Sequence, residues 1–168
     1  TEFTIENGSS TIGGGILIDS ASPKILNNII EDNHATDNGG GIYKKKGRME
    51  GAPSLIEGNL IQGNISDDKG GGIYINIANT LIYNNDIIGN HAYKGAGIYM
   101  IQSNANMVDC RIKSNVTSGQ GSGIQMHRSS PRLINLNVSE NMGGHYAIYV
   151  FCSDPYIVKS SIYNNDSG

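Results

Sequence analysis

Several features that decide the class of a protein are scarce in this 168-residue sequence. It contains no tryptophan, charged residues make up only 16% of it, and its formal net charge is −3. Without a basic face, the chain is not expected to bind nucleic acid. No apolar run approaches the ~18 residues of a membrane-spanning helix, and no signal peptide is present. These absences exclude a nucleic-acid-binding protein and a membrane span within this segment.

Cysteine is also scarce, with one residue at position 110 and one at position 152. Cys110 and Cys152 stand at different positions of the repeat described below. A disulfide between them would require Cα atoms within about 7 Å of each other. The sequence leaves open whether they are bonded.

Glycine is abundant, and much of it lies in a stretch that recurs along the chain. Residues 30–43 read IEDNHATDNGGGIY. Related stretches lie at 4–17, 61–74, 87–99, 112–125 and 138–149. Each repeat carries a marker asparagine, and the markers are Asn7, Asn33, Asn64, Asn90, Asn115, Asn141 and Asn165. Neighbouring markers are 24 to 31 residues apart, a period in the range of solenoid repeats.

Each repeat contains three short apolar pieces separated by Asn, Gly, Ser and Pro. A helical repeat would need apolar residues at i, i+3, i+4 and i+7 over ten or more residues, and a leucine-rich repeat would need more leucine. Short strands, each paired with its equivalent in the next repeat about 4.8 Å away, fit the pattern better. The sequence therefore predicts one all-β domain over residues 1–168, a parallel β-helix (β-solenoid) of about six coils of three short strands. The general rule for parallel crossovers makes it right-handed.

The glycine run and the marker asparagines have predicted roles at the turns. Glycine supplies positive φ and allows a close approach of backbone to backbone, where the chain enters the strand beginning at Ile42. The marker asparagine is expected at the preceding corner in the left-handed conformation, hydrogen-bonded to backbone or to its neighbours. We therefore predict a buried asparagine ladder formed by Asn33, Asn64, Asn90, Asn115 and Asn141.

The recurring GGGI and I-x-x-N pairs resemble the right-handed parallel β-helix repeats of the pectin-lyase-like superfamily. They are most similar to the GGA-I and F-x-x-N repeats of the chlamydial polymorphic outer-membrane, autotransporter-like proteins, with Ile or Val in place of Phe. The resemblance covers nearly the whole chain and implies the β-helix fold. It implies an extracellular or cell-surface setting, in a superfamily that includes polysaccharide lyases and hydrolases, adhesins and surface scaffolds.

Tyrosine recurs at one outward position of the strand that follows the glycines. Side chains alternate along a strand, so the residue after each inward isoleucine points outward. This column contains Tyr43, Tyr74, Tyr99 and Tyr149. An outward tyrosine strip is a candidate glycan-binding surface, with sugar rings stacked on the phenol rings. The alternative is that the tyrosines only stack on one another and stabilise the sheet.

The segment 44–52 is the one insert in the repeat and contains the run KKKGRME. Because Lys44 replaces an inward residue, we expect the strand to bulge or end early there. A solvated loop and a catalytic loop are both consistent with this insert. A polysaccharide lyase would use a basic residue as the base, for which Arg48, Lys45 and Lys46 are candidates. A glycoside hydrolase would use two carboxylates, for which Asp19 and Glu50 are the candidates.

Acidic residues recur in the polar segment before the glycines. Asp37 and Asp68 are expected to stack in neighbouring coils, with Asp67 beside them, which makes the three weak candidates for Ca²⁺ ligands. A solvated acidic loop, partly offset by Lys69 and Lys94, is the alternative. No cofactor is predicted.

The ends of the chain resemble the middle of a coil. We therefore expect the segment to belong to a larger chain or assembly, or to stack head to tail with identical copies. The function favoured by these observations is a non-enzymatic, extracellular surface repeat domain or fibre segment that acts in adhesion and binds a polysaccharide or cell-surface glycan. The alternative is a polysaccharide-active enzyme that uses the insert.

Overall fold

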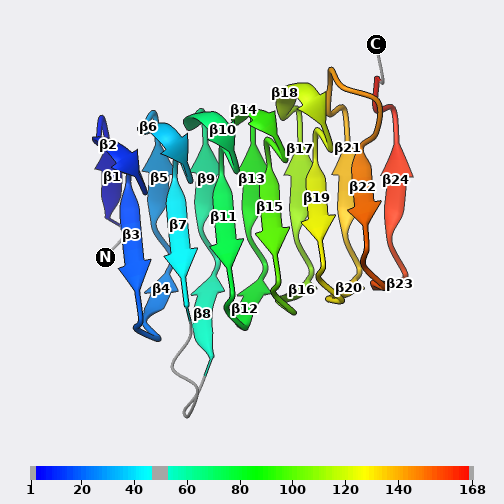
Figure 1. Ribbon diagram of the computed structural model, residues 1–168, viewed down its shortest axis with the longest axis horizontal. Helices are drawn as coiled ribbons and strands as arrows, with labels where there is room; N and C mark the ends of the chain where they lie inside the picture. Colours follow the sequence, from blue (N-terminus) through cyan, green and yellow to red (C-terminus); the bar gives the residue numbers. More distant parts are fainter. Residues whose placement is uncertain (1–2, 47–52, 167–168) are drawn as a thin grey trace.

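The computed structural model describes residues 3–46 and 53–166, which form 24 short strands stacked coil upon coil along one axis (Figure 1). All strand pairs are parallel. Among the residues described there is no helix, and so none that could cross a membrane. The predicted parallel β-solenoid is confirmed.

Each full coil passes through four sheets, which we name A to D. Sheet A contains β1 (Thr4–Glu6), β5 (Ile29–Glu31), β9 (Leu60–Gln62), β13 (Asp86–Ile88), β17 (Arg111–Lys113), β21 (Asn137–Ser139) and β24 (Ser161–Tyr163). Sheet B contains β2 (Ser9–Ile12), β6 (His34–Asn38), β10 (Ile65–Lys69), β14 (His91–Lys94) and β18 (Val116–Gln120). Sheet C contains β3 (Ile16–Asp19), β7 (Ile42–Lys45), β11 (Ile73–Asn76), β15 (Ile98–Ile101), β19 (Ile124–His127) and β22 (Ile148–Phe151). Sheet D contains β4 (Lys24–Leu26), β8 (Ser54–Glu57), β12 (Thr80–Tyr83), β16 (Asn106–Val108), β20 (Arg132–Ile134) and β23 (Tyr156–Val158).

The sequence predicted three strands per coil, and the additional strand is the one in sheet B. The sequence indicates a polar loop there, because the segment has no large apolar residue at the buried position. The side chains that it buries are small, namely Ala35, Ser66, Ala92 and Thr117. Small side chains suffice because the chain turns tightly back toward sheet C just after this strand.

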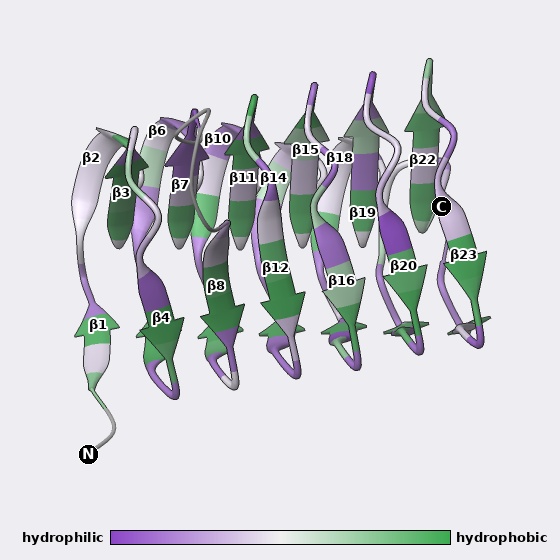
Figure 2. Cartoon of the chain, turned by 90° about the horizontal axis from the view of Figure 1, so that it is seen from below, coloured by the Kyte–Doolittle hydropathy of each residue, from purple (hydrophilic) through white to green (hydrophobic). Residues whose placement is uncertain are grey.

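The core lies inside the coils and is built from stacked isoleucines and similar residues. Sheet A contributes Ile61 and Ile87, sheet C contributes Ile73 and Ile98, and all of these are fully buried. Equivalent residues pair in register from coil to coil, for example Ile73 with Ile98. Figure 2 shows the resulting bands of apolar and polar residues repeating along sheets C and D. The predicted inward columns are thus confirmed.

The glycine run has the two predicted roles, carried by different members of the run. Gly39 has φ of +72°, a left-handed conformation that L residues rarely adopt. A Cβ atom added to Gly41 would lie only 2.7 Å from the carbonyl oxygen of Gly72 in the next coil. The first glycine therefore makes the turn, and the third allows neighbouring coils to approach.

The asparagine ladder is present, and its members are almost fully buried. Asn90 shows the pattern: its Oδ1 accepts hydrogen bonds from the backbone N–H and Nδ2 of Asn64, both at 3.0 Å. Its Nδ2 donates to the carbonyl of Ile61 at 2.9 Å and to Oδ1 of Asn115 at 3.0 Å. The left-handed conformation belongs to the preceding residue, such as Asp32 before Asn33, and not to the ladder asparagine as predicted.

The first marker, Asn7, lies one position before the ladder column. Strand β1 pairs with β5 so that Asn7 corresponds to Asp32 and Gly8 to Asn33. Asn7 has the left-handed backbone, with φ of 56°, and Gly8 occupies the ladder position. Gly8 donates its N–H to Oδ1 of Asn33 at 2.9 Å but contributes no side chain to the ladder.

A second ladder, which we did not predict, stands at the corner between sheets D and A. The backbone N–H and Nδ2 of Asn28 both donate to Oδ1 of Asn59, and Asn59 donates likewise to Asn85. Cys110 follows in this column and is buried, so burial raises the pKa of its thiol to about 11. Cys152 is exposed, and both cysteines are free.

Lys44 lies inside the solenoid at the base of the insert. It occupies the inward column of Ile75 and Met100 and is fully buried. Its Nζ donates to the carbonyl oxygens of Ala21 and Lys46, both at 2.6 Å, and burial lowers the pKa of its amine. We expected the strand to bulge or end at this residue. Instead β7 continues to Lys45, because the long side chain reaches carbonyl groups at the corner.

The last coil exposes side chains whose equivalents are buried in the coil before it. Val150, Ile157 and Ile162 are 40–50% exposed. Their partners in the preceding coil are Met126, Leu133 and Val138, all fully buried. The last described coil therefore presents an apolar surface.

Candidate functional site

Three of the four predicted strip tyrosines are not available on the surface. Tyr43, Tyr74 and Tyr99 pair in register on the outer side of sheet C, as predicted, but they are only 3–7% exposed. Their rings stack, with centroids 4.8 Å apart for Tyr43 and Tyr74 and 5.5 Å apart for Tyr74 and Tyr99. The expectation that they form an exposed platform is therefore wrong.

These tyrosines form a second apolar cluster outside the main core, with Ile12 of β2 and Ile101 of β15 packed against it. Burial raises the pKa of Tyr74, and the neighbouring Tyr43 raises it further. Asp37 and Asp68 contribute in the same direction, which places both carboxylates near the phenol. The alternation of side chains along the strand predicts correctly that these tyrosines point out of the core. It does not predict that the end of sheet B covers them.

Tyr149 differs from the other three because its ring reaches the surface. It is half-buried and lies between Tyr146 and Phe151, with centroid distances of 5.4 Å and 6.5 Å and interplanar angles of 19° and 12°. Tyr146 and Phe151 are 49% and 47% exposed. We call Tyr146, Tyr149 and Phe151 the aromatic surface.

The aromatic surface is separated from the buried tyrosines by Gln125. This residue pairs with Tyr99 on one side and Tyr149 on the other, and it is only 5% exposed. The aromatic surface combines two residues on β22 with Tyr146, which lies in a segment without a regular strand. Sequence reasoning missed Tyr146 because that segment departs from the repeat, although the sequence HYAIYVF already gathers aromatic residues.

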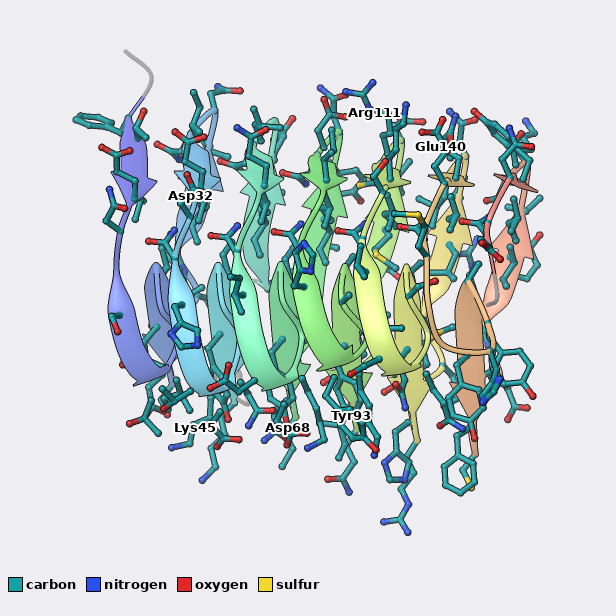
Figure 3. All side chains as sticks on the ribbon, turned by 90° about the horizontal axis from the view of Figure 1, so that it is seen from above. Asp32, Lys45, Asp68, Tyr93, Arg111 and Glu140 are labelled. Carbon is teal, nitrogen blue, oxygen red and sulfur yellow. The ribbon has the colours of Figure 1, made fainter. Side chains whose placement is uncertain are left out.

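The catalytic candidates near the insert are only partly brought together. Asp19 and Lys45 lie on neighbouring strands of sheet C, with Nζ 3.5 Å from Oδ2, and both side chains are well exposed. Lys45 points outward from the solenoid (Figure 3). The Ser20 hydroxyl, which donates to Asp19, lowers the pKa of that carboxyl, and Lys45 adds to the effect. Lys46 is exposed and has a left-handed backbone. The other two candidates, Arg48 and Glu50, lie outside the described residues.

The three acidic candidates for Ca²⁺ ligands do not converge. Asp67 points to the outer face of sheet B, where its Oδ1 lies 2.9 Å from Nε2 of His34. Asp68 points to the other side and forms an ion pair with Lys69, close to the buried tyrosines with Asp37. Within residues 3–46 and 53–166, no three His, Cys, Asp or Glu side chains group as metal ligands.

Comparison with known protein families matches residues 2–166 to the family described as "Right handed beta helix region". Neither the curated proteins nor the solved structures contain a match to the chain. The family match covers nearly the whole sequence and agrees with the parallel coils, the inward isoleucine columns and the asparagine ladder. The chain therefore belongs to the right-handed beta helix family.

Proposed function

We propose that this protein is a non-enzymatic repeat scaffold at the cell surface or outside the cell, where it acts in adhesion by binding a glycan on the aromatic surface. The observation that carries the proposal is the exposure of the Tyr146 and Phe151 rings on either side of Tyr149. Aromatic rings offer a flat apolar face, and the tyrosine hydroxyls add hydrogen bonds at the edge. The resemblance to surface β-helix proteins supports the setting.

The geometry favours this surface over the buried strip. In the strip, each face of Tyr74 is occupied by a neighbouring tyrosine. A sugar could reach those rings only by separating them, which would also break a packed cluster. On the aromatic surface, the two outer rings retain about half of their exposure.

Glycan binding is tested on an oligosaccharide array with wild-type protein and with Tyr146→Ala and Phe151→Ala. We expect both variants to lose at least tenfold in affinity for any saccharide that wild type binds, because each removes a stacking face. The matched control is Tyr156→Ala, which removes a 55% exposed ring from sheet D. If no saccharide binds the wild type, or if Tyr156→Ala has the same effect, the proposal is wrong.

The protein prepared for the array can also be used to distinguish the scaffold from the alternative enzyme. Release of oligosaccharides from a polysaccharide by the wild type, abolished in an Arg48→Ala, Glu50→Gln double variant, would favour the polysaccharide-active enzyme that uses the insert. The scaffold predicts binding without release.

We also propose that copies of the chain stack head to tail, because the exposed Val150, Ile157 and Ile162 offer an apolar surface to a further coil. Light scattering at tens of micromolar is expected to give a mass well above 17.9 kDa for the wild type. An Ile157→Asp, Ile162→Asp double variant is expected to be monomeric, since two charges would be buried without partners. A stable wild-type monomer would contradict this proposal.

A further inference from the structure

The outer face of sheet D is largely apolar, and the proposed function does not use it. The strands of this sheet lie side by side (Figure 2). Each strand has two outward positions on either side of a buried residue, as Leu81 and Tyr83 flank Ile82 in β12. We call the following six outward residues the apolar patch: Leu55, Leu81, Tyr83, Val108, Ile134 and Val158.

The apolar patch is continuous from coil to coil. Four of its members form one unbroken column, which runs in register from Tyr83 in β12 to Val158 in β23. The other two, Leu55 and Leu81, pair in register at the first outward position of β8 and β12. All six are half-buried by their neighbours in the sheet, and neither the core nor the tyrosine cluster includes them. A continuous apolar surface of this kind marks an interaction site.

Two pairs of opposite charges border the apolar patch. Lys24 stands at the first outward position of β4, and Glu57 stands at the second outward position of the adjacent strand, β8. Arg132 stands at the first outward position of β20, and Asp109 directly follows the second outward position of the adjacent strand, β16. All four are exposed. In both pairs the base and the acid therefore lie on opposite borders, one coil apart.

Contacts within the molecule leave these four charges without a counter-charge. None of them forms an ion pair with another residue in the described part of the chain. The guanidinium carbon of Arg132 lies 5.0 Å from the ring centroid of Tyr156. Oδ1 of Asp109 accepts a hydrogen bond from Nδ2 of Asn135 at 2.6 Å. Both of these partners are neutral, so the charges remain available to a binding partner.

A second copy of the chain complements this face. Two copies can pack sheet D against sheet D about a two-fold axis that runs parallel to the solenoid axis. The first outward position of one copy then lies over the second outward position of the same strand in the other copy, so that Leu81 lies over Tyr83. Lys24 is offset by one coil, about 4.8 Å, from Glu57 of the other copy. Arg132 and Asp109 are related in the same way.

The symmetry of this arrangement doubles each favourable contact. A two-fold interface presents the same surface from both copies, so each of the two ion pairs occurs twice. The antiparallel arrangement, centred between β12 and β16, would instead place Glu57 over Ile134 and Arg132 over Leu55. Charges facing apolar side chains lose water without gaining a partner. The observed charges therefore favour two solenoids that run in the same direction.

Other occupants of the face fit less well. A peptide that adds a strand needs an unpaired sheet edge, and β8, β12, β16 and β20 are each paired on both sides. The negative surface of a membrane would attract Lys24 and Arg132 but repel Glu57 and Asp109. The alternating charges at the borders match a second copy of the same face.

The dimensions of the face predict a weak interface. Six strands at a spacing of about 4.8 Å, with about four residues of ~3.3 Å each, give roughly 29 Å by 13 Å. The resulting area of about 400 Å² per copy is half of the ~800 Å² per partner that is typical of stable complexes. We expect a dissociation constant on the order of hundreds of micromolar. Each further coil of the same kind would enlarge the interface.

We propose that the outer face of sheet D is a self-association surface, through which two copies of the chain pair side by side and in the same direction. The apolar patch supplies the contact area, and the Lys24–Glu57 and Arg132–Asp109 pairs set the orientation. This lateral pairing involves neither the ends of the solenoid nor the aromatic surface.

The proposal is tested by sedimentation equilibrium on the Ile157→Asp, Ile162→Asp chain, in which end-to-end stacking is blocked. This variant should be monomeric at tens of micromolar. At about 1 mM, above the expected dissociation constant, its average mass should rise toward twice 17.9 kDa. If the wild type is itself monomeric at tens of micromolar, which would contradict end-to-end stacking, the same measurement is made on the wild type. Failure of one association is thus distinguished from failure of the other.

A substitution in the apolar patch assigns the association to sheet D. In the same background, Leu81→Glu is expected to weaken it at least tenfold, because a carboxylate would be buried against Tyr83 of the other copy. The matched control is Ile88→Glu, at a half-buried outward position of β13 in sheet A, which should change nothing. Circular dichroism checks that each variant folds, and Val108→Glu replaces Leu81→Glu if that variant does not.

An exchange of charges tests the direction of the two solenoids. Glu57→Lys alone is expected to weaken the association at least fivefold, because Lys24 would then face a like charge. The combined Lys24→Glu, Glu57→Lys chain should recover the original affinity, because the pair is restored with its signs reversed. The antiparallel arrangement predicts no recovery, since Lys24 and Glu57 do not meet in it.

Four results would overturn the proposal. The first is a mass that stays at that of the monomer at about 1 mM, well above the expected dissociation constant. The second is an equal effect of Leu81→Glu and Ile88→Glu, and the third is a lack of recovery in the charge exchange. The fourth is binding to phosphatidylglycerol vesicles that Leu81→Glu abolishes, which would show that the face docks on lipid.

Discussion

Replacing Asn90 by Ala is expected to lower the free energy of unfolding by about 3–5 kcal/mol, because three buried polar groups lose their partners at about 1–3 kcal/mol each. These groups are the backbone N–H and an Nδ2–H of Asn64, and the carbonyl of Ile61. Urea denaturation measured by circular dichroism gives the value. Asn90 is fully buried, so water has no direct access to replace the lost bonds.

Two further variants show whether the ladder itself is responsible. Asn90→Asp keeps the acceptor for Asn64, but its side chain cannot donate to Ile61 or Asn115, so it should also be strongly destabilising. Asn79→Ala, at an exposed asparagine, should change the stability by less than about 0.5 kcal/mol. A loss below about 1 kcal/mol for Asn90→Ala would mean that the ladder contributes little.

Gly97→Ala is expected to destabilise the protein by about 3 kcal/mol or more, because a Cβ atom there has no room. It would lie 2.4 Å from the carbonyl oxygen of Gly123, 3.0 Å from Cγ2 of Ile112 and 3.1 Å from Nδ2 of Asn115. The nearest atom is backbone in the adjacent coil, so the coils themselves must separate. Overpacking in a dense interior costs about 1–3 kcal/mol, and a rigid backbone neighbour raises the cost.

Gly89→Ala provides the matched control for this clash. Gly89 has φ of +62°, but an added Cβ would meet nothing within 4 Å. Its replacement should therefore cost only about 1–2 kcal/mol, from the left-handed backbone alone. The contrast is measured by thermal unfolding of both variants. Equal losses would show that the spacing of the coils at Gly97 is looser than the structure indicates.

The repeated pattern made the fold predictable, because each turn and each inward column appears several times in one sequence. A single Asn33 or Ile42 would carry little information, but their equivalents in the following coils exclude other folds. What the pattern could not show was sheet B. Its buried residues Ala35, Ser66 and Thr117 are small or polar, so the strand has no apolar signature.

The exposure of outward side chains was harder to predict, because it depends on which other residues pack over the strand. Tyr74 and Tyr149 occupy the same column, yet one is covered and the other half-exposed. A shallow hollow on the outer face of sheet B is lined by residues of three coils, among them Asp67 and Tyr93, that are far apart in the sequence. Neither alternation nor spacing reveals whether such side chains enclose a hollow.

The direction of the ladder bonds has a consequence for how long such a protein can be. Between the ladder side chains, each asparagine accepts a hydrogen bond from the asparagine of the coil before it and donates one to the asparagine of the coil after it, as Asn64, Asn90 and Asn115 do in turn. The leading side of a coil is therefore complementary to the trailing side of an identical coil. A duplicated coil could therefore be inserted next to its original with the ladder bonds continued through it. The molecule is modular at the scale of one coil, and its length can change by whole coils.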